Sequence, residues 1–274
     1  MLFKAISSPI NRLIKTNVLN TCLRQVQTSV ATRQQQQPSL DSFGTESADD
    51  KTVVMDETIK KAYEESLSHA DYFDINRLFT VRQLFESRVH LGHKLGTLNP
   101  HMTPYLFGKR LGSLVIDLDQ TAQRLREALN FTAHIAFRDG IILFINRSLN
   151  TTHLVEKTAK ECNQFSHCRE WNSRTFYDST IYFGAVTRLP DLVIFLNAMN
   201  NVFEMHPAVV DSAKLLIPTV GIVDTNSDPT LITYPIPGND DTYQSIQLFC
   251  RLFKQSIILG QRKRKQLLDS LDNR

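Results

Sequence analysis

The sequence predicts a three-layer α/β sandwich, and two observations lead to this prediction. Short runs that are apolar throughout, such as Ile141–Ile145 and Leu192–Leu196, alternate with longer segments of helical periodicity. Strands that are apolar on both faces are typical of a parallel sheet buried between helices, and parallel neighbours need crossover connections. We therefore expect a mostly parallel sheet with right-handed crossovers and helices on both faces, in a flavodoxin-like arrangement.

The strands of this sheet are expected at apolar, β-branched runs that are bounded by turn-forming residues. They lie at Ser113–Leu118, Ile141–Ile145, Leu192–Leu196 and Pro218–Val223, with a shorter fifth at Leu231–Tyr234. The loop after Val223 is rich in Asp, Asn and Ser, whose side chains hydrogen-bond nearby backbone and fix the exit of a strand.

Helices are expected where apolar residues recur at spacings of three and four behind a capping residue. In the segment Asp119–Arg138, for example, Leu125 and Leu129 share one face, Asp119 is the expected N-cap, and Gly140 breaks the pattern. The five segments are Val81–Arg88, Asp119–Arg138, a helix capped by Thr151 or Thr152 and ending near Cys162, Pro207–Leu215, and Asp241–Gly260.

The charge pattern divides the chain into blocks, although the formal net charge is only +3. Residues 1–40 hold five Lys and Arg and no acid, whereas residues 41–75 hold ten acids against three lysines. Residues 76–274 carry 23 basic and 18 acidic groups. We divide the chain into a leader and linker (1–40), an acidic extension (41–75), an α/β domain (76–261) and a basic C-terminal tail (262–274).

The first forty residues have the composition of a mitochondrial transit peptide. Apolar residues at helical spacing give one apolar and one basic face, which Pro9 interrupts. Lys4, Arg12 and Lys15 leave no continuous apolar core for a secretory signal. We expect import into the mitochondrial matrix; a basic arm that stays attached is the alternative. The acidic extension is expected to pack late or to remain mobile, with one helix over Thr58–His69.

Several classes of protein and site find no support in the sequence. The longest apolar runs are far shorter than the ~18 residues that span a bilayer, and four cysteines are too few for a secreted disulfide framework. No expected strand end carries the glycine-rich turn that admits a phosphate. Asp224, Asn226 and Asp228 resemble the start of a calcium loop, but Pro229 and Pro235 occupy its sixth and twelfth places.

Catalysis has no candidate residues either. Cys162, His167 and Cys168 lack zinc-knuckle spacing and have no fourth ligand nearby in the sequence. A Cys–His hydrolase would need an orienting acid and an oxyanion pocket, which no segment indicates. We therefore expect no catalytic residue, no metal, no cofactor and no small-molecule substrate.

Residues 82–110 are the strongest candidate for binding a polyanion. This segment holds five Lys and Arg and three His against the single acid Glu86, interleaved with glycines and prolines. Glycine lets the backbone approach a phosphate closely, and cations gain affinity by releasing condensed counterions. We expect a loop-like stretch in which Tyr105 and Phe107 pack against the sheet, although either could stack on a base.

Two stretches of the chain are distinctive. The first is Val89–His93 followed by Asn99–Gly108, and the second is the segment from Pro218 to Asp241. Both resemble the ribosomal protein S2 family of bacterial, chloroplast and mitochondrial ribosomes. Together with the smaller matches named below, the resemblance covers residues 80–260. It implies a structural role at the head–body junction of the small ribosomal subunit, without enzymatic activity. Smaller matches lie at Ile142–Phe144, Cys162–Phe165 and Leu189–Phe195.

The chain departs from the family pattern in two places. Trp171–Thr175 stands where the family usually has a glycine pair with Leu-Thr-Asn, which weakens the case for RNA contacts by that loop, although Arg169 and Arg174 keep its charge. Only about twenty residues separate Trp171 from Asp191, too few for the helical hairpin that bacterial members insert. A compact form without the hairpin resembles the mitochondrial members.

Charge and resemblance together predict contacts mainly to phosphates, which position a protein on RNA. The expected partners are small-subunit ribosomal RNA and neighbouring mitochondrial ribosomal proteins, with no membrane and no homo-oligomer. The cations of the tail could equally bind an acidic neighbour. The predicted RNA-binding residues are Arg82, Arg88, His90, His93, Lys94, Asn99, Lys109, Arg110, Arg147, Arg169, Arg174, Arg262, Lys263, Arg264 and Lys265.

Two other interpretations stay open at this point. The first is a matrix enzyme or binding protein that uses a flavodoxin-like sheet to hold a phosphorylated small molecule. The second is an adaptor that binds no RNA and bridges proteins through its charged ends.

Overall fold

A five-stranded parallel sheet forms the centre of the protein. The computed structural model describes residues 59–172, 174–178, 188–201 and 203–272, so the leader and residues 41–58 lie outside the described part. The strand order is β5-β4-β6-β7-β8. The chain leaves β4 for β5 on one side and then enters β6 on the other, which places the topological switch point between β4 and β6. The strands are β4 (Ile142–Ile145), β5 (Phe165–His167), β6 (Leu192–Phe195), β7 (Thr219–Val223) and β8 (Tyr234–Pro237).

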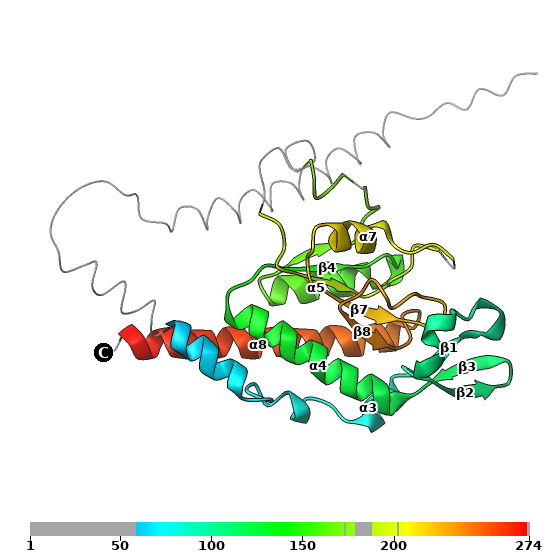
Figure 1. Cartoon of the computed structure of the whole chain (residues 1–274), viewed down its shortest axis with the longest axis horizontal. Helices are drawn as coiled ribbons and strands as arrows, with labels where there is room; N and C mark the ends of the chain where they lie inside the picture. Colours follow the sequence, from blue (N-terminus) through cyan, green and yellow to red (C-terminus); the bar gives the residue numbers. More distant parts are fainter. Residues whose placement is uncertain (1–58, 173, 179–187, 202, 273–274) are drawn as a thin grey trace, which may run out of the picture.

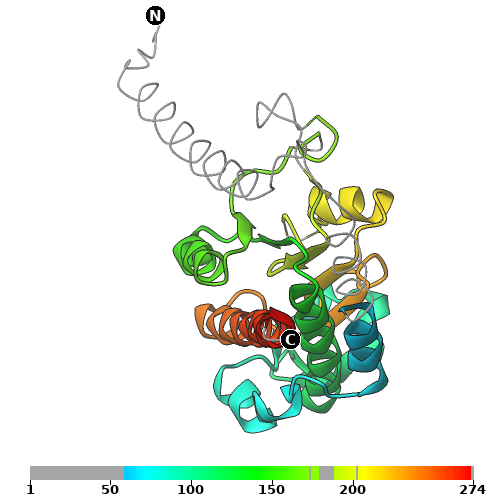
Figure 2. The same cartoon turned by 90° about the vertical axis from the view of Figure 1, so that its left-hand side faces the viewer.

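Helices cover both faces of this sheet (Figures 1 and 2). Because side chains alternate along a strand, Ile142 and Phe144 of β4 join one core cluster, whereas Ile145 joins the other. The predicted three-layer α/β fold is thereby confirmed. The first layer consists of α4 (Leu118–Phe137), α5 (Thr152–Glu161) and α8 (Tyr243–Asp272), and the opposite face is covered by α7 (Pro207–Lys214).

The folded body begins earlier than residue 76, where the α/β domain was predicted to start. Residues 59–68 form a helix, and the ring of Tyr63 lies 5.3 Å from that of Phe137. Phe73 and Ile75 are buried in the core. Residues 59–75 of the acidic extension are therefore packed against the body. They lead into η1 (Ile75–Arg77) and α3 (Val81–Glu86), whose N-cap Thr80 forms a capping box with Gln83.

Helix α8 does not end at Gly260, where the sequence predicted its end, but continues to Asp272. A Cβ atom at Gly260 would lie 2.4 Å from the carbonyl oxygen of Ala133 in α4. Glycine is thus required for the close crossing of two helices and does not mark a helix end. The four consecutive cations after Gln261 lie on this helix.

A second sheet occupies much of the segment that was predicted to be a loop. β1 (Leu91–Lys94), β2 (Leu106–Arg110) and β3 (Ser113–Ile116) pair antiparallel in the order β1-β3-β2, and we call them the hairpin sheet. The strand expected at Ser113–Leu118 therefore belongs here and not to the parallel sheet. Leu111 and Gly112, with φ of 51° and 80°, form the turn between β2 and β3, as a type I′ hairpin requires. Two 3-10 segments, η2 (Leu95–Thr97) and η3 (Pro100–Tyr105), join β1 to β2.

Three smaller features also differ from the predictions. Asp117, not Asp119, caps α4, because its Oδ1 accepts a hydrogen bond from the Asp119 amide at 3.0 Å. β5 was not predicted, and η4 (Leu149–Thr151) precedes α5.

The edge strand β8 lies at Tyr234–Pro237, later than the predicted 231–234. The amide of Gly238 donates to the carbonyl oxygen of Val223 in β7. Because amides alternate in direction along a strand, Pro235 and Pro237 occupy the positions that face away from β7.

Candidate nucleic-acid interface

The hairpin sheet lies at one end of the α/β body (Figure 1). Residues 87–116 contain no Asp or Glu. The loop after β7 holds the sheet in place, since Thr225 accepts a hydrogen bond from the His93 amide at 2.9 Å and its carbonyl oxygen accepts one from the Asn99 amide at 2.9 Å. The two stretches that were distinctive in the sequence are therefore in direct contact.

The predicted cations of this sheet are exposed. Lys94 of β1 and Arg110 of β2 both pair with Ser113 of the central strand β3. Residues directly opposite each other on neighbouring strands point to the same face, so these two cations leave one face about 10 Å apart. Lys109 and Arg88 are also exposed, and none of the four forms an ion pair with a residue in the described ranges.

Phe107 projects into solvent, contrary to the expectation that it packs on the sheet. The register of β2 against β3 shifts between Leu106 and Gly108, so Phe107 is the extra residue of a β-bulge. Bulges re-aim a side chain, and that of Phe107 is 80% exposed. Tyr105 does pack, as expected, in the smaller core cluster.

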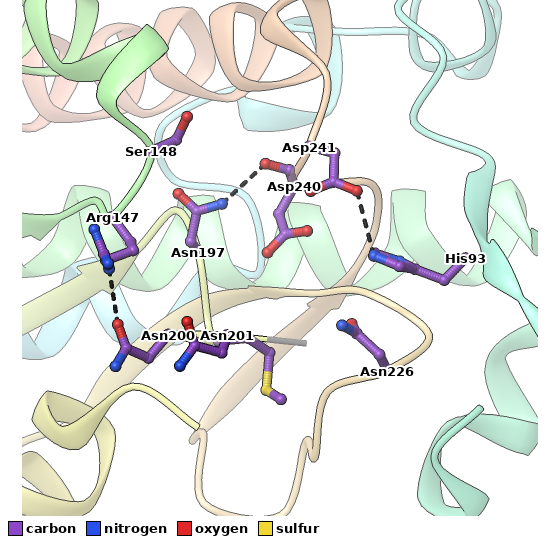
Figure 3. Close-up of a pocket in the computed structure, with 10 residues that line it drawn as sticks. His93, Arg147, Ser148, Asn197, Asn200, Asn201, Asn226, Asp240 and Asp241 are labelled. Carbon is purple, nitrogen blue, oxygen red and sulfur yellow. Dashed lines mark hydrogen bonds and ion pairs between the residues drawn. The ribbon is translucent and has the colours of Figure 1, made fainter. Parts of the chain in front are cut away.

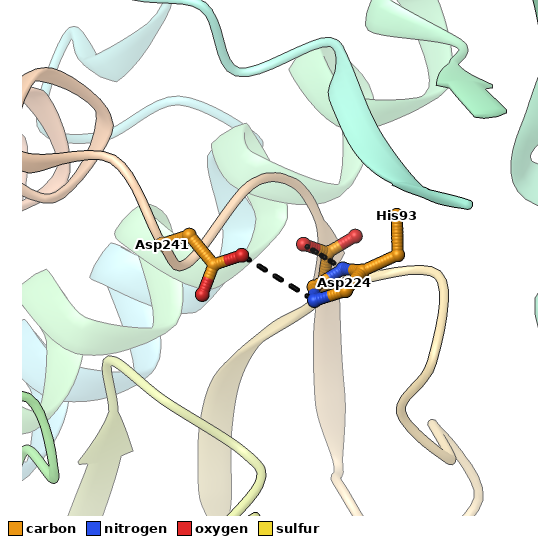
Figure 4. Close-up of side chains that lie close together, drawn as sticks. All are labelled: His93, Asp224 and Asp241. Atoms are coloured by element: carbon orange, nitrogen blue, oxygen red, sulfur yellow. Dashed lines mark ion pairs between the residues drawn. The ribbon is translucent and has the colours of Figure 1, made fainter. Parts of the chain in front are cut away.

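His90, which precedes β1, and His93 of β1 are not simple surface cations. His90 stacks on Phe85 at 4.5 Å, and burial lowers its pKa. His93 lies between two carboxylates (Figure 4): its Nδ1 is 3.0 Å from Asp224 and its Nε2 is 3.3 Å from Asp241. The hydrogen bond to Asp224, opposed in part by burial, raises the pKa of His93 to about 9. His93 is thus positively charged at neutral pH and is neutralised within the protein.

The polar atoms of His93, Asp224 and Asp241 lie within 4.8 Å of one another, as in a metal site, but the protonated His93 ring has no lone pair to offer a metal and itself supplies the positive charge between the two carboxylates. The sequence did not indicate this cluster, because His93 is far along the chain from the two aspartates. Asp228, the third residue of the calcium-like string, instead faces Nδ1 of His101 at 3.2 Å.

Two further predicted residues are engaged within the protein. Arg82 pairs with Glu86 at 2.8 Å on the surface of α3. The side chain of Asn99 accepts a hydrogen bond from the His101 amide at 3.0 Å and thereby caps η3.

The arginines at the ends of the strands lie elsewhere on the surface. Arg147 follows β4 and donates to Oδ1 of Asn200 at 2.7 Å, and Arg169 follows β5 and lies 3.7 Å from Glu156. Arg174 is exposed in a turn over residues 174–177. Because carboxyl ends of parallel strands share one edge, Arg147 and Arg169 belong to the same edge of the sheet.

The cations at the end of α8 divide into two pairs. Arg262 and Lys265 are exposed. Lys263 donates to the Tyr72 carbonyl and lies 4.0 Å above the Tyr72 ring. Arg264 donates to the Tyr63 hydroxyl at 3.2 Å and to the Phe137 carbonyl at 3.3 Å. Lys263 and Arg264 therefore bind the N-terminal segment of the protein itself.

The cysteines of the described ranges, including the candidates Cys162 and Cys168, behave as packed core residues. Cys162, Cys168 and Cys250 are buried free thiols. Burial raises the pKa of each to about 12, so none carries the thiolate that a nucleophile or a metal ligand needs.

In the described ranges, no helix is both long and apolar enough to span a bilayer. The model of the family described as ribosomal protein S2 matches residues 84–179 and 174–260.

Individual relatives agree with this match. The chain is 54% identical over 203 residues to the small ribosomal subunit protein uS2m of Bos taurus, covering 74% of this chain and 69% of the relative. It is 31% identical over 220 residues to uS2 of Anaplasma phagocytophilum (66% and 74%) and 30% identical over 238 residues to uS2 of Neorickettsia sennetsu (69% and 78%). The chain is a mitochondrial member of the ribosomal protein S2 family.

Proposed function

We propose that this protein is a structural constituent of the small subunit of the mitochondrial ribosome, in the matrix. The hairpin sheet binds ribosomal RNA, and other surfaces contact neighbouring ribosomal proteins. Family membership supports the assembly, and the exposed, acid-free hairpin sheet is the observation that supports the RNA contact. In this role the protein supports translation as a scaffold that needs no chemistry of its own.

The hairpin sheet is suited to phosphate contacts more than to reading a sequence. Lys94, Lys109 and Arg110 project from strands whose backbone is fixed to the body, so little ordering is needed on binding. Cationic side chains position a protein on the RNA backbone, and the exposed ring of Phe107 offers a stacking surface for an unpaired base. RNA contacts by the other exposed candidates, Arg88, Arg147, Arg169, Arg174, Arg262 and Lys265, remain part of the proposal.

Charge neutralisation of the hairpin sheet tests this function. We expect the triple variant Lys94→Gln/Lys109→Gln/Arg110→Gln to be lost from small subunits when expressed in place of the wild type. Binding of the purified chain to small-subunit RNA should also lose about two units of the slope of log K against log salt, because roughly 0.7–0.9 counterions are released per phosphate contact.

The matched control removes the same charge elsewhere. Lys157→Gln/Lys160→Gln/Lys214→Gln neutralises three exposed lysines on α5 and α7 and should incorporate normally. Thermal unfolding of both triple variants should match the wild type. Normal incorporation of the hairpin variant would refute the proposed RNA contact.

Sedimentation separates a ribosomal constituent from a free matrix enzyme or an adaptor. Tagged wild-type protein is expected to migrate with the small subunit at high and low magnesium concentration. A free soluble peak under both conditions would favour the enzyme, and co-migration without any RNA crosslink to residues 88–110 would favour the adaptor.

A further inference from the structure

A small cavity lies at the carboxyl edge of the parallel sheet (Figure 3). Its volume is about 180 Å³. Arg147 and Ser148 enter it from the end of β4, and Asn197 enters it from the end of β6. These are the two strands between which the strand order reverses, and in open parallel α/β sheets ligands bind in this crevice.

The cavity contains a buried hydrogen-bond acceptor that lacks a partner. Asn197 is 8% exposed, and its Nδ2 donates to the Asp240 carbonyl at 2.9 Å, which fixes the orientation of the amide. Its Oδ1 is buried and has no hydrogen-bond partner in the part of the chain that the structure describes. In Figure 3 this oxygen points away from Asp240 on the side of Arg147 and Ser148. Because this oxygen is closed off from solvent, the N–H donor of a ligand would satisfy it after a small movement of the surrounding side chains.

The other lining groups restrict the class of ligand. Asn200, Asn201 and Asn226 line the cavity with side-chain amides, of which Asn200 already accepts a hydrogen bond from Arg147 and Asn201 already donates one to Glu204, and Met199 adds an apolar surface. The carboxylate of Asp241 disfavours a phosphate, while Arg147 disfavours an isolated cation. A neutral, planar group with alternating donors and acceptors fits this set. The volume is below the ~300–1,000 Å³ of clefts that hold drug-sized ligands, so it suits one ring system.

We propose that this cavity binds a nucleobase, with Asn197 Oδ1 accepting a hydrogen bond from an N–H on the edge of the base and Met199 in contact with its face. Asparagine side chains recognise base edges, and RNA-binding proteins read unstacked bases in this manner. The base comes either from an unstacked nucleotide of ribosomal RNA, which rests on the proposed function, or from a free nucleoside.

Methionine methyl NMR on the free full-length chain tests the cavity without the ribosome. Adenosine, cytidine, guanosine and uridine are added separately at millimolar concentration to protein that carries ¹³C-methyl methionine. The Met199 methyl resonance should shift with at least one nucleoside, whereas that of the fully buried Met102 should not.

Two variants locate the binding. Asn201→Trp places a large ring in the exposed wall of the cavity and should abolish the Met199 shift. Its control, Asn76→Trp, makes the same change at an exposed position that does not line the cavity and should keep the shift. Asn197→Leu removes the acceptor and should weaken binding at least tenfold. A Met199 shift that survives both Asn201→Trp and Asn197→Leu would overturn the proposal.

Photocrosslinking in assembled small subunits distinguishes the two sources of the base. An RNA adduct on the peptide that contains Asn197–Asn201 identifies ribosomal RNA as the source. A nucleoside-induced shift without such an adduct identifies a free nucleoside. Neither a shift nor an adduct, or a crosslink from this peptide to protein alone, would overturn the proposal. The NMR arm needs no assembly, so failure of the RNA-binding function and failure of this inference give different results.

Discussion

The hairpin sheet and the C-terminal end of α8 look alike in the sequence and differ in the structure. Both are rich in Lys and Arg, and both were predicted to bind RNA. The cations of the hairpin sheet point into solvent, because no element of the described ranges buries β2. In α8, helical periodicity turns Lys263 and Arg264 toward Tyr72 and Tyr63 and leaves Arg262 and Lys265 outside. The position of a cation relative to the core, and not its presence, determines whether it can reach a partner.

The largest expected effect tests Arg264, one of the two α8 cations that bind the N-terminal segment. Arg264→Ala should lower the free energy of unfolding by about 2 kcal/mol, because two hydrogen bonds from a charged donor to the N-terminal segment and α4 are lost. Urea denaturation measures the effect, and affinity for RNA should stay unchanged. The control is Arg262→Ala, an exposed neighbour on the same helix, which should leave stability unchanged. Equal stability losses in both variants would remove the contrast between the two pairs.

A smaller effect sharpens the contrast on the hairpin side. Phe107→Ala should weaken binding of the purified chain to small-subunit RNA by about 1–2 kcal/mol through lost stacking, without changing thermal stability, since the ring is 80% exposed. Filter binding or anisotropy measures the affinity. Phe85→Ala removes a ring that is 60% exposed and stacks on His90, and it serves as the control. A fall in melting temperature on Phe107→Ala would mean that the ring packs in solution.

The smallest expected effect concerns His93, which forms ion pairs with Asp224 and Asp241. Its folded pKa of about 9 lies above the ordinary value of 6.5, so its contribution to stability is complete below pH 6.5 and is lost as the pH rises through 9. Burial also raises the pKa of Asp240 to about 8, which acts in the same direction because ionisation of this buried carboxyl costs stability as the pH rises. The free energy of unfolding, measured in urea at pH 6.5, 7.5 and 9, should fall as the pH rises. This fall should be about 1 kcal/mol smaller in His93→Gln than in the wild type.

A matched substitution at His153, an exposed residue of α5, provides the control for this pH series. His153→Gln should retain the full decline between pH 6.5 and 9. An unaltered decline in His93→Gln would contradict the ion pairs with Asp224 and Asp241.

The parallel sheet could be predicted because the apolar character of its strands is continuous along the chain. Leu192–Phe195 and Ile142–Ile145 are apolar on both faces, and short runs of this kind between helical segments are typical of strands buried in a parallel sheet. The hairpin sheet could not be predicted in the same way. Its strands are short, mostly exposed and interrupted by a bulge at Phe107, so no alternation between core and solvent marks them.

The candidate site was predictable only in part, for a related reason. Charge and glycine content located Lys94, Lys109 and Arg110, which need no partner to be exposed. The pairing of His93 with Asp224 and Asp241 depends on contacts between distant segments, and the unpartnered Oδ1 of Asn197 depends on a hydrogen bond to the backbone of Asp240. Local composition carries no information on such contacts.

The two prolines of β8 affect what the edge of the parallel sheet can bind. An open sheet edge is a template on which another chain can add a strand. At Pro235 and Pro237 the outward positions of this edge have no amide to offer. Thr121 of α4 also donates to the Pro237 carbonyl at 2.8 Å, so this border of the sheet offers little free backbone to a second strand.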